Sequence, residues 1–187
     1  MGAGPLTLWT VGHSTLAIEE FIALLTAHGI MNLADVRMHP GSRRFPQFNA
    51  EPLARSLHDA GIAYAPFHDL GGRRPALPDS PNIAWKNASF RGYADFMQTP
   101  AFAGALDRLI AAAREKPTAI MCAESLWWRC HRSLIADALK VRGIQVLHIM
   151  GNGPAKEHPY TAPATIIDGK LSYAGPARSE GPGSLWE

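Results

Sequence analysis

Apolar segments of two kinds alternate along the chain. Short apolar runs of strand length are followed by longer segments in which apolar positions recur with helical spacing. The expected strands are residues 6–11, 31–36, 62–67, 118–121 and 145–150. The expected helices are residues 18–28, 50–60, 92–97, 100–115 and 133–142. Strands separated by helices predict an α/β fold, a single domain with a mostly parallel sheet and helices on both faces.

The last part of the chain breaks this alternation. Residues 164–167 and 171–173 are expected to form a β-hairpin that turns at Asp168 and Gly169. From Gly175 onward, Gly, Pro and Ser dominate, which is typical of a tail. We therefore expect one α/β domain over residues 1–174 and a Gly/Pro/Ser-rich C-terminal tail over residues 175–187. The length of 187 residues and the hydrophobic content of 47% fit one domain with a substantial core.

Overall composition narrows the class of protein without naming a function. The formal net charge is only +2, so local clusters of charge matter more than the total. No apolar stretch approaches the roughly 18 residues of a membrane span, and the N-terminus lacks the features of a secretory signal. The two cysteines are too few for a disulfide framework. We expect a cytoplasmic protein without membrane association, and both cysteines as thiols.

Polar and charged residues follow four of the expected strands. They are His13 and Ser14 after the first strand, Asp35 and Arg37 at the end of the second, His68, Arg73 and Arg74 after the third, and Glu124, Cys130, His131 and Arg132 after the fourth. The carboxyl ends of parallel strands meet at one edge of the sheet, where α/β proteins bind their ligands. The sequence therefore predicts that these residues share one cleft.

Four motifs in this region resemble the motifs of a known protein family. They are Thr10-Val-Gly-His-Ser14, Asp35-Val-Arg37 with Pro40 and Ser42, Leu70-Gly-Gly-Arg73, and Cys122-Ala-Glu124 followed by Cys130-His-Arg132. In this order they resemble the domain of unknown function family 488, over roughly residues 8–149. The resemblance implies the fold and a site formed by these motifs, and it implies no reaction.

Arginine dominates the loops of the predicted cleft. Its planar guanidinium suits bidentate contact with phosphate or carboxylate, so we expect an anionic ligand. The proposed ligand-binding residues are Ser14, Asp35, Arg37, Arg73 and Arg132. The alternative is that these arginines pair with acidic neighbours or lie in solvent. Aromatic residues interleave with the arginines, as stacking of nucleic-acid bases would require, although aromatic residues are also common in cores.

The catalytic candidates are Glu124, His13, His131 and Cys130. A carboxylate directly after a buried strand suits a general base, so Glu124 is the preferred reactive group. Cys130 would open a helix beside Arg132, which favours the thiolate, but a small buried cysteine is also common in cores. The histidines and carboxylates do not have the spacing of a local metal-ligand motif, so no metal is assigned and the cofactor remains unknown.

The sequence is compatible with three functions. The first is an enzyme that acts on a phosphate-bearing compound, a nucleotide or damaged nucleic acid. The second is a nucleic-acid or nucleotide binding module without catalysis. The third is thiol-based transfer or redox chemistry at Cys130. The concentration of polar residues at strand ends favours an enzyme, because nucleic-acid modules more often spread basic residues over an open face. An anionic small molecule or a nucleic acid is the expected partner.

Overall fold

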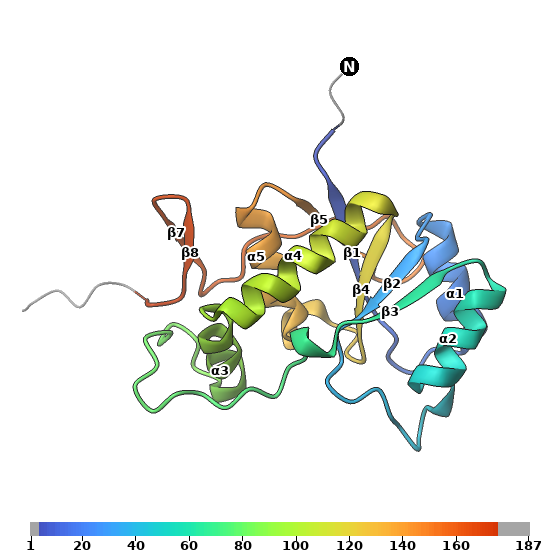
Figure 1. Cartoon of the computed structure of the whole chain (residues 1–187), viewed down its shortest axis with the longest axis horizontal. Coiled ribbons are helices and arrows are strands. Elements are labelled where there is room, and N and C mark those ends of the chain that lie inside the picture. The colour runs from blue at the N-terminus through green and yellow to red at the C-terminus, as the bar shows by residue number, and fades with distance from the viewer. Residues whose placement is uncertain (1–3, 176–187) are drawn as a thin grey trace, which may run out of the picture.

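The structure is a computed structural model that describes residues 4–175 of the chain. Beyond Gly175, the tail expected from the sequence lies outside the described residues. The elements alternate as the apolar pattern predicts, and the predicted α/β class is confirmed (Figure 1). The strands are β1 (Thr7–Gly12), β2 (Asn32–Asp35), β3 (Ala63–Pro66), β4 (Thr118–Cys122), β5 (Gln145–His148), β6 (Lys156–Glu157), β7 (Thr165–Ile167) and β8 (Lys170–Ser172). The helices are α1 (Ile18–Ala27), α2 (Ala50–Asp59), α3 (Ala88–Met97), α4 (Pro100–Glu115) and α5 (Arg132–Val141), with short 3₁₀ turns η1 (Pro46–Phe48), η2 (His68–Leu70) and η3 (Trp127–Arg129).

Six strands form the main sheet, in the order β3-β2-β4-β1-β5-β6. All pairings among β1 to β5 are parallel, whereas β6 pairs antiparallel with β5. The two residues of β6 are too few to leave a hydrophobic pattern, so the sequence did not predict this strand. β7 and β8 form the predicted hairpin, with Asp168 and Gly169 both at positive φ in the turn.

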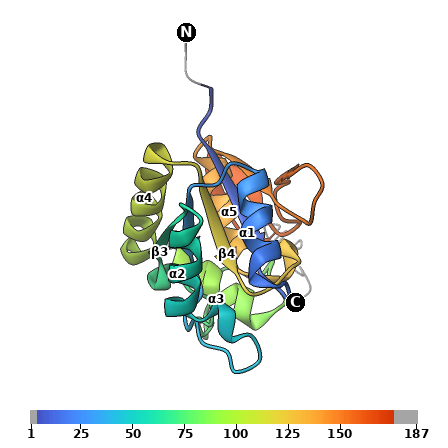
Figure 2. The ribbon, with the colours of Figure 1, turned by 90° about the vertical axis from the view of Figure 1, so that its right-hand side faces the viewer.

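The sheet separates two apolar clusters, one on each face. Leu24, Leu53 and Leu57, from α1 and α2, belong to the cluster on one face. Residues of α3, α4 and α5 belong to the other. Neighbouring residues of β4 point to opposite clusters, because side chains alternate along a strand: Ile120 lies in one and Met121 in the other. Figure 2 shows α4 and α1 on opposite sides of the strands.

The topology opens a crevice at the carboxyl end of β4. The connections that leave β1 and β2 run through α1 and α2 over one face, and the connection that leaves β4 runs through α5 over the other. β4 lies between β1 and β2 in the sheet. Adjacent loops therefore diverge on both sides of β4, which is where open α/β sheets hold their ligands.

Helix α3 begins four residues before the position expected from hydrophobic spacing. The side chain of Asn87 accepts hydrogen bonds from the backbone N–H groups of Ser89 (2.8 Å) and Phe90 (3.3 Å), so it caps the helix. The first residues of α3, Ala88 to Arg91, have no apolar periodicity, so helical spacing did not predict this turn. Among residues 4–175, no helix is both long and apolar enough to cross a membrane.

Candidate functional site

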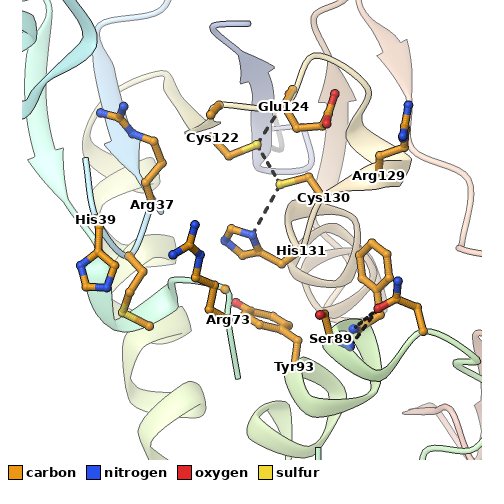
Figure 3. Close-up of a pocket in the computed structure, with 15 residues that line it drawn as sticks. Arg37, His39, Arg73, Ser89, Tyr93, Cys122, Glu124, Arg129, Cys130 and His131 are labelled. Atoms are coloured by element: carbon orange, nitrogen blue, oxygen red, sulfur yellow. Dashed lines mark hydrogen bonds between the residues drawn. The ribbon is translucent and has the colours of Figure 1, made fainter. Parts of the chain in front are cut away.

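A pocket of about 580 Å³ opens where the topology predicts it. Figure 3 shows the side chains around it. The lining residues are Arg37, Met38, His39, Gly72, Arg73, Asn87, Ser89, Phe90, Tyr93, Cys122, Ala123, Glu124, Arg129, Cys130 and His131. They come from the loops that follow β2, β3 and β4 and from the N-terminal ends of α3 and α5.

The loop between β4 and α5 is fixed by its backbone. The N–H groups of His13 and Ser14 donate to the carbonyls of Cys122 (3.1 Å) and Ala123 (3.0 Å), which extends the β1–β4 pairing past the strands. The Arg132 side chain is 1% exposed, and its Nη2 donates to the carbonyl oxygens of Glu124 (2.6 Å) and Ser125 (3.1 Å). Arg132 therefore holds this loop from behind and is not among the residues that line the pocket.

Two thiols and an imidazole lie together at one side of the pocket. The Sγ atoms of Cys122 and Cys130 are 2.7 Å apart, and Cys130 Sγ is 3.5 Å from His131 Nδ1 (Figure 3). The other ring nitrogen of His131, Nε2, lies 3.0 Å from the Val36 carbonyl oxygen. A carbonyl only accepts hydrogen bonds, so Nε2 carries the proton and the lone pair of Nδ1 faces Cys130.

The surroundings shift the pKa values of the two thiols in opposite directions. Burial raises the pKa of Cys130, but the Cys122 thiol and the Arg132 guanidinium oppose this and bring the pKa below that of an ordinary thiol. Burial and the neighbouring Cys130 raise the pKa of Cys122 well above the ordinary value. Burial lowers the pKa of His131, which favours its neutral form. Cys130 therefore forms a thiolate more readily than Cys122 does.

Arg37 is held rigidly at the end of β2. Its Nε and Nη2 donate to the two carboxylate oxygens of Asp35, at 2.8 Å and 2.6 Å, in a bidentate ion pair. Asp35 is fully buried and also accepts a hydrogen bond from the Tyr64 hydroxyl at 2.7 Å. Burial and this contact with Asp35 raise the pKa of Tyr64, so the hydroxyl stays protonated. Asp35 thus aims Arg37 and itself lies outside the lining of the pocket.

His13 lies behind Arg37. Its Nδ1 lies 3.0 Å from the Ser14 carbonyl oxygen and therefore carries the proton, so Nε2 is the acceptor that faces Arg37 Nη1 at 3.4 Å. Its ring stacks on Phe48 with centroids 4.1 Å apart. Burial and the Arg37 charge lower the pKa of His13 to about 4. His13 is a neutral support for Arg37 and does not line the pocket.

Two further arginines line the pocket and are exposed to solvent. Arg73 adopts a left-handed backbone conformation, with φ of 60°, which is uncommon for a residue with a side chain. Figure 3 shows its side chain directed into the space between Arg37 and His131, with Arg129 on the far side of the pocket. Arg73 and Arg129 appear in none of the ion pairs found among residues 4–175. Glu124 is the carboxylate that lines the same pocket.

The structure brings part of the predicted site together. Arg37, Arg73, Glu124, Cys130 and His131 all line the one pocket. Six predicted residues do not line it: Asp35, His13, Arg132, Ser14, His68 and Arg74. The first three hold Arg37 or the β4–α5 loop, and Ser14 contributes a backbone hydrogen bond to Ala123. His68 Nδ1 lies 2.8 Å from the Arg37 carbonyl oxygen, and Arg74 donates to the carbonyl oxygens of Gly71 and Asp69.

Sequence reasoning missed other members of the pocket. Cys122 was not among the predicted site residues, yet it lines the pocket although only 3% of it is exposed. The rule that placed Asp35 in the site, the end of a buried parallel strand, applies equally to Cys122 and could have identified it. Asn87 and Ser89 belong to a helix turn without apolar periodicity, so no comparable sequence pattern predicts them.

A buried polar network behind the site was also missed. Asp137 accepts hydrogen bonds from His158 Nε2 (2.8 Å), Thr161 Oγ1 (2.5 Å) and the Tyr173 hydroxyl (2.7 Å). Because a carboxylate only accepts, His158 then accepts through Nδ1 from His148 Nε2 at 2.9 Å.

The network contacts the β4–α5 loop through the Trp127 ring, which lies against both His148 and His158. Trp127, in η3, stacks on the His148 ring with centroids 4.3 Å apart and an interplanar angle of 3°. Burial lowers the pKa of His148 to about 3, so this ring is neutral. The network therefore supports the segment that carries Arg129 and Cys130.

In the part of the chain that the structure describes, no group of three His, Cys, Asp or Glu side chains is arranged to hold a metal ion.

Comparison with known proteins identifies the family of the chain. No curated protein and no solved structure matches the chain. One family model matches residues 17–139, which include the motifs at Asp35, Leu70 and Cys122 but not Thr10-Val-Gly-His-Ser14. The chain therefore belongs to the family described as domain of unknown function DUF488, as its motifs predict.

Proposed function

We propose that the chain is an enzyme that binds a phosphate-bearing compound in this pocket and attacks it with the Cys130 thiolate. The observation that carries the proposal is the position of Cys130 Sγ, 3.5 Å from the unprotonated nitrogen of His131 in a pocket lined by three arginines. A nucleophile beside a base that a third group orients is the usual arrangement of covalent catalysis. Here the orienting group is the Val36 carbonyl.

Several positive groups favour an anion in the pocket. Arg73 and Arg129 supply guanidinium groups, while Arg37 is already paired with Asp35. The first turn of α3 and His131, the residue before α5, also line the pocket, and the N-terminal end of a helix attracts negative charge. Opposing them, Glu124 contributes one negative charge. This balance suits a phosphate group better than a neutral or cationic ligand.

The size of the pocket indicates an organic compound rather than a free anion. A volume of about 580 Å³ lies in the range of roughly 300–1,000 Å³ that is typical of sites for small organic molecules. Phe90 and Tyr93 line the pocket together with the charged groups. We therefore assign the phosphate to the arginines and an apolar or aromatic portion of the substrate to these rings.

The residues divide the reaction between them. The Cys130 sulfur forms a bond to phosphorus while the bond from phosphorus to the leaving oxygen breaks. His131 is neutral before the reaction; it takes the Cys130 thiol proton through Nδ1 as the sulfur attacks and gives it to that oxygen. Glu124 then takes a proton from the water that releases phosphate from Cys130, which restores the thiolate. In this scheme Glu124 keeps the general-base role predicted from the sequence, and Cys130 is the nucleophile.

Protection of Cys130 from alkylation tests the proposal. Phosphate, pyrophosphate and AMP would be titrated against the rate at which iodoacetamide modifies Cys130, followed by mass spectrometry of peptides. We expect AMP to slow the reaction at lower concentrations than phosphate does. Arg73→Lys should raise the AMP concentration needed by about tenfold, because the bidentate fork is lost. Arg55→Lys is the matched control, since Arg55 is 71% exposed on α2 and pairs with Glu51.

Two results would count against the proposal. If none of the three compounds changes the rate, the pocket does not bind phosphate. If AMP binds but Cys130 reacts no faster than an ordinary thiol, the chain is better described as a nucleotide-binding module.

A further inference from the structure

Cys122 has no part in the proposed reaction, yet it lies against the reactive thiol. Its Sγ is 2.7 Å from Cys130 Sγ, with no atom between them. Cys122 ends β4 and Cys130 lies two residues before the start of α5, so two regular elements bring together residues that are eight positions apart. Both cysteines are free thiols, and each lines the pocket.

The two thiols are not equivalent. Cys130 is 8% exposed and Cys122 is 3% exposed, so Cys130 is the more accessible to a small reagent. The positive charge of Arg132 and the contact with Cys122 favour the thiolate at Cys130, against the effect of burial. Burial keeps Cys122 protonated. Reactive cysteines that sense oxidants combine accessibility, thiolate character and a neighbouring second thiol.

We propose that Cys122 and Cys130 form a reversible disulfide when a hydroperoxide oxidises Cys130, with Cys122 as the resolving thiol. The inference rests on the proposed function only in that both need a reactive Cys130 thiolate. The disulfide would remove the nucleophile from the pocket, so an oxidant would switch off the reaction and a thiol reductant would restore it.

The step balances with the hydroperoxide as the two-electron oxidant. The Cys130 thiolate attacks one peroxide oxygen, the O–O bond breaks, and the other oxygen leaves as an alcohol or water after it takes a proton. Cys130 is then a sulfenic acid. The Cys122 sulfur attacks the Cys130 sulfur, the S–S bond forms and the S–O bond breaks. The hydroxyl leaves as water with the Cys122 proton. A dithiol reductant returns two electrons and two protons and restores both thiols.

Without Cys122 the same oxidation would continue further. A sulfenic acid that meets no second thiol is oxidised to sulfinic and sulfonic acids, which simple thiols do not reduce. The adjacent thiol therefore protects Cys130 from irreversible loss.

The test uses the full chain, hydrogen peroxide and mass spectrometry under non-reducing conditions. In the unsubstituted protein we expect one intramolecular link between Cys122 and Cys130, which dithiothreitol reverses completely. In Cys122→Ser we expect the sulfinic or sulfonic form of Cys130, which dithiothreitol does not reverse. In Cys130→Ser we expect Cys122 to remain a thiol. Circular dichroism would check that both variants fold.

The outcomes separate this inference from the proposed function. If peroxide leaves the unsubstituted protein without the link while iodoacetamide still modifies Cys130 readily, the disulfide proposal is wrong and the proposed nucleophile survives. If the link forms but no phosphate compound protects Cys130, the proposed function is wrong and the disulfide stands. If Cys130 reacts with neither reagent, both proposals fail.

Discussion

Gly12 and Glu124 are in direct backbone contact at the edge of the site. A Cβ atom placed on Gly12 would overlap the Glu124 carbonyl group and would lie 2.9 Å from the Ser125 Cα. β1 can approach the β4–α5 loop this closely only because residue 12 has no side chain. The contact sets the position of the loop that carries Cys130.

Replacing Gly12 by Ala should therefore disturb both stability and the site. We expect the free energy of unfolding to fall by about 1–3 kcal/mol, as in overpacked cores, because backbone atoms rather than a flexible side chain must move. Urea denaturation would measure this change. Gly104→Ala is the control: its Cβ would meet nothing within 4 Å, and in the interior of α4 it should raise stability by up to about 1 kcal/mol. Equal effects of the two substitutions would contradict the argument.

Substitution of Asp137 tests whether its buried carboxylate stabilises the fold. It accepts hydrogen bonds from His158, Thr161 and Tyr173, and it is fully buried. Asp137→Asn puts an amide N–H₂ where one of these donors needs an acceptor, so we expect a loss of about 2–4 kcal/mol in thermal or urea unfolding. Asp168→Asn should have little effect, because Asp168 lies in an exposed turn at φ of 50°, which Asn tolerates well.

Hydrophobic spacing and strand direction made some features of the fold and site predictable from the sequence. Hydrophobic period distinguishes strands from helices, and parallel strands place their carboxyl ends at one edge, which was enough to put Arg37, Arg73 and Cys130 near one another. The strand order was not accessible, because β4 enters between β1 and β2 through pairings distant in sequence.

The contacts that support the site from behind were even harder to predict from the sequence. His148 and His158 are not among the predicted site residues, because an isolated histidine in a strand or loop forms no recognisable sequence pattern. Only the fold shows that they join Asp137 in one network. Similarly, Arg132 has the same sequence signal as Arg37, but the fold directs it to backbone carbonyls behind the pocket.

Mild acid should destabilise the protein through its buried histidines. Burial and Arg37 lower the pKa of His13 to about 4, and burial and His158 lower that of His148 to about 3. An unfolded histidine takes up a proton below about pH 6.5, whereas these two stay neutral in the folded state. Stability is therefore complete above about pH 6.5 and falls as the pH drops toward 4, on the order of 2 kcal/mol per histidine at pH 5.

Urea denaturation at pH 7.5 and pH 5 would measure this effect. His148→Gln should reduce the difference between the two pH values, because glutamine has no proton to take up. His58→Gln should leave the difference unchanged, because the His58 side chain is 90% exposed. A pH dependence that survives both the His148 substitution and the corresponding His13→Gln substitution would show that other groups cause it.

Loss of the Cys130 thiol should reduce the turnover rate more than loss of the Glu124 carboxylate does. With p-nitrophenyl phosphate as a simple substrate, we expect Cys130→Ser to abolish phosphate release, since the nucleophile is lost. Glu124→Gln should lower the rate by roughly 10²–10⁴-fold, the usual contribution of general acid–base catalysis. Full activity of Cys130→Ser together with an inactive Glu124→Gln would restore the carboxylate as the reactive group.

The pH dependence of Cys130 alkylation tests the central claim most directly. The rate of modification by iodoacetamide, measured separately for each cysteine by mass spectrometry, would be followed from pH 5 to pH 10. The midpoint of this curve reports thiolate formation and does not depend on how accessible the sulfur is. We predict a midpoint for Cys130 below that of an ordinary thiol, a rise in this midpoint in Cys122→Ala, and slow modification of Cys122 throughout. A Cys130 midpoint at or above about 8.5, the value of an unperturbed thiol, would contradict the account.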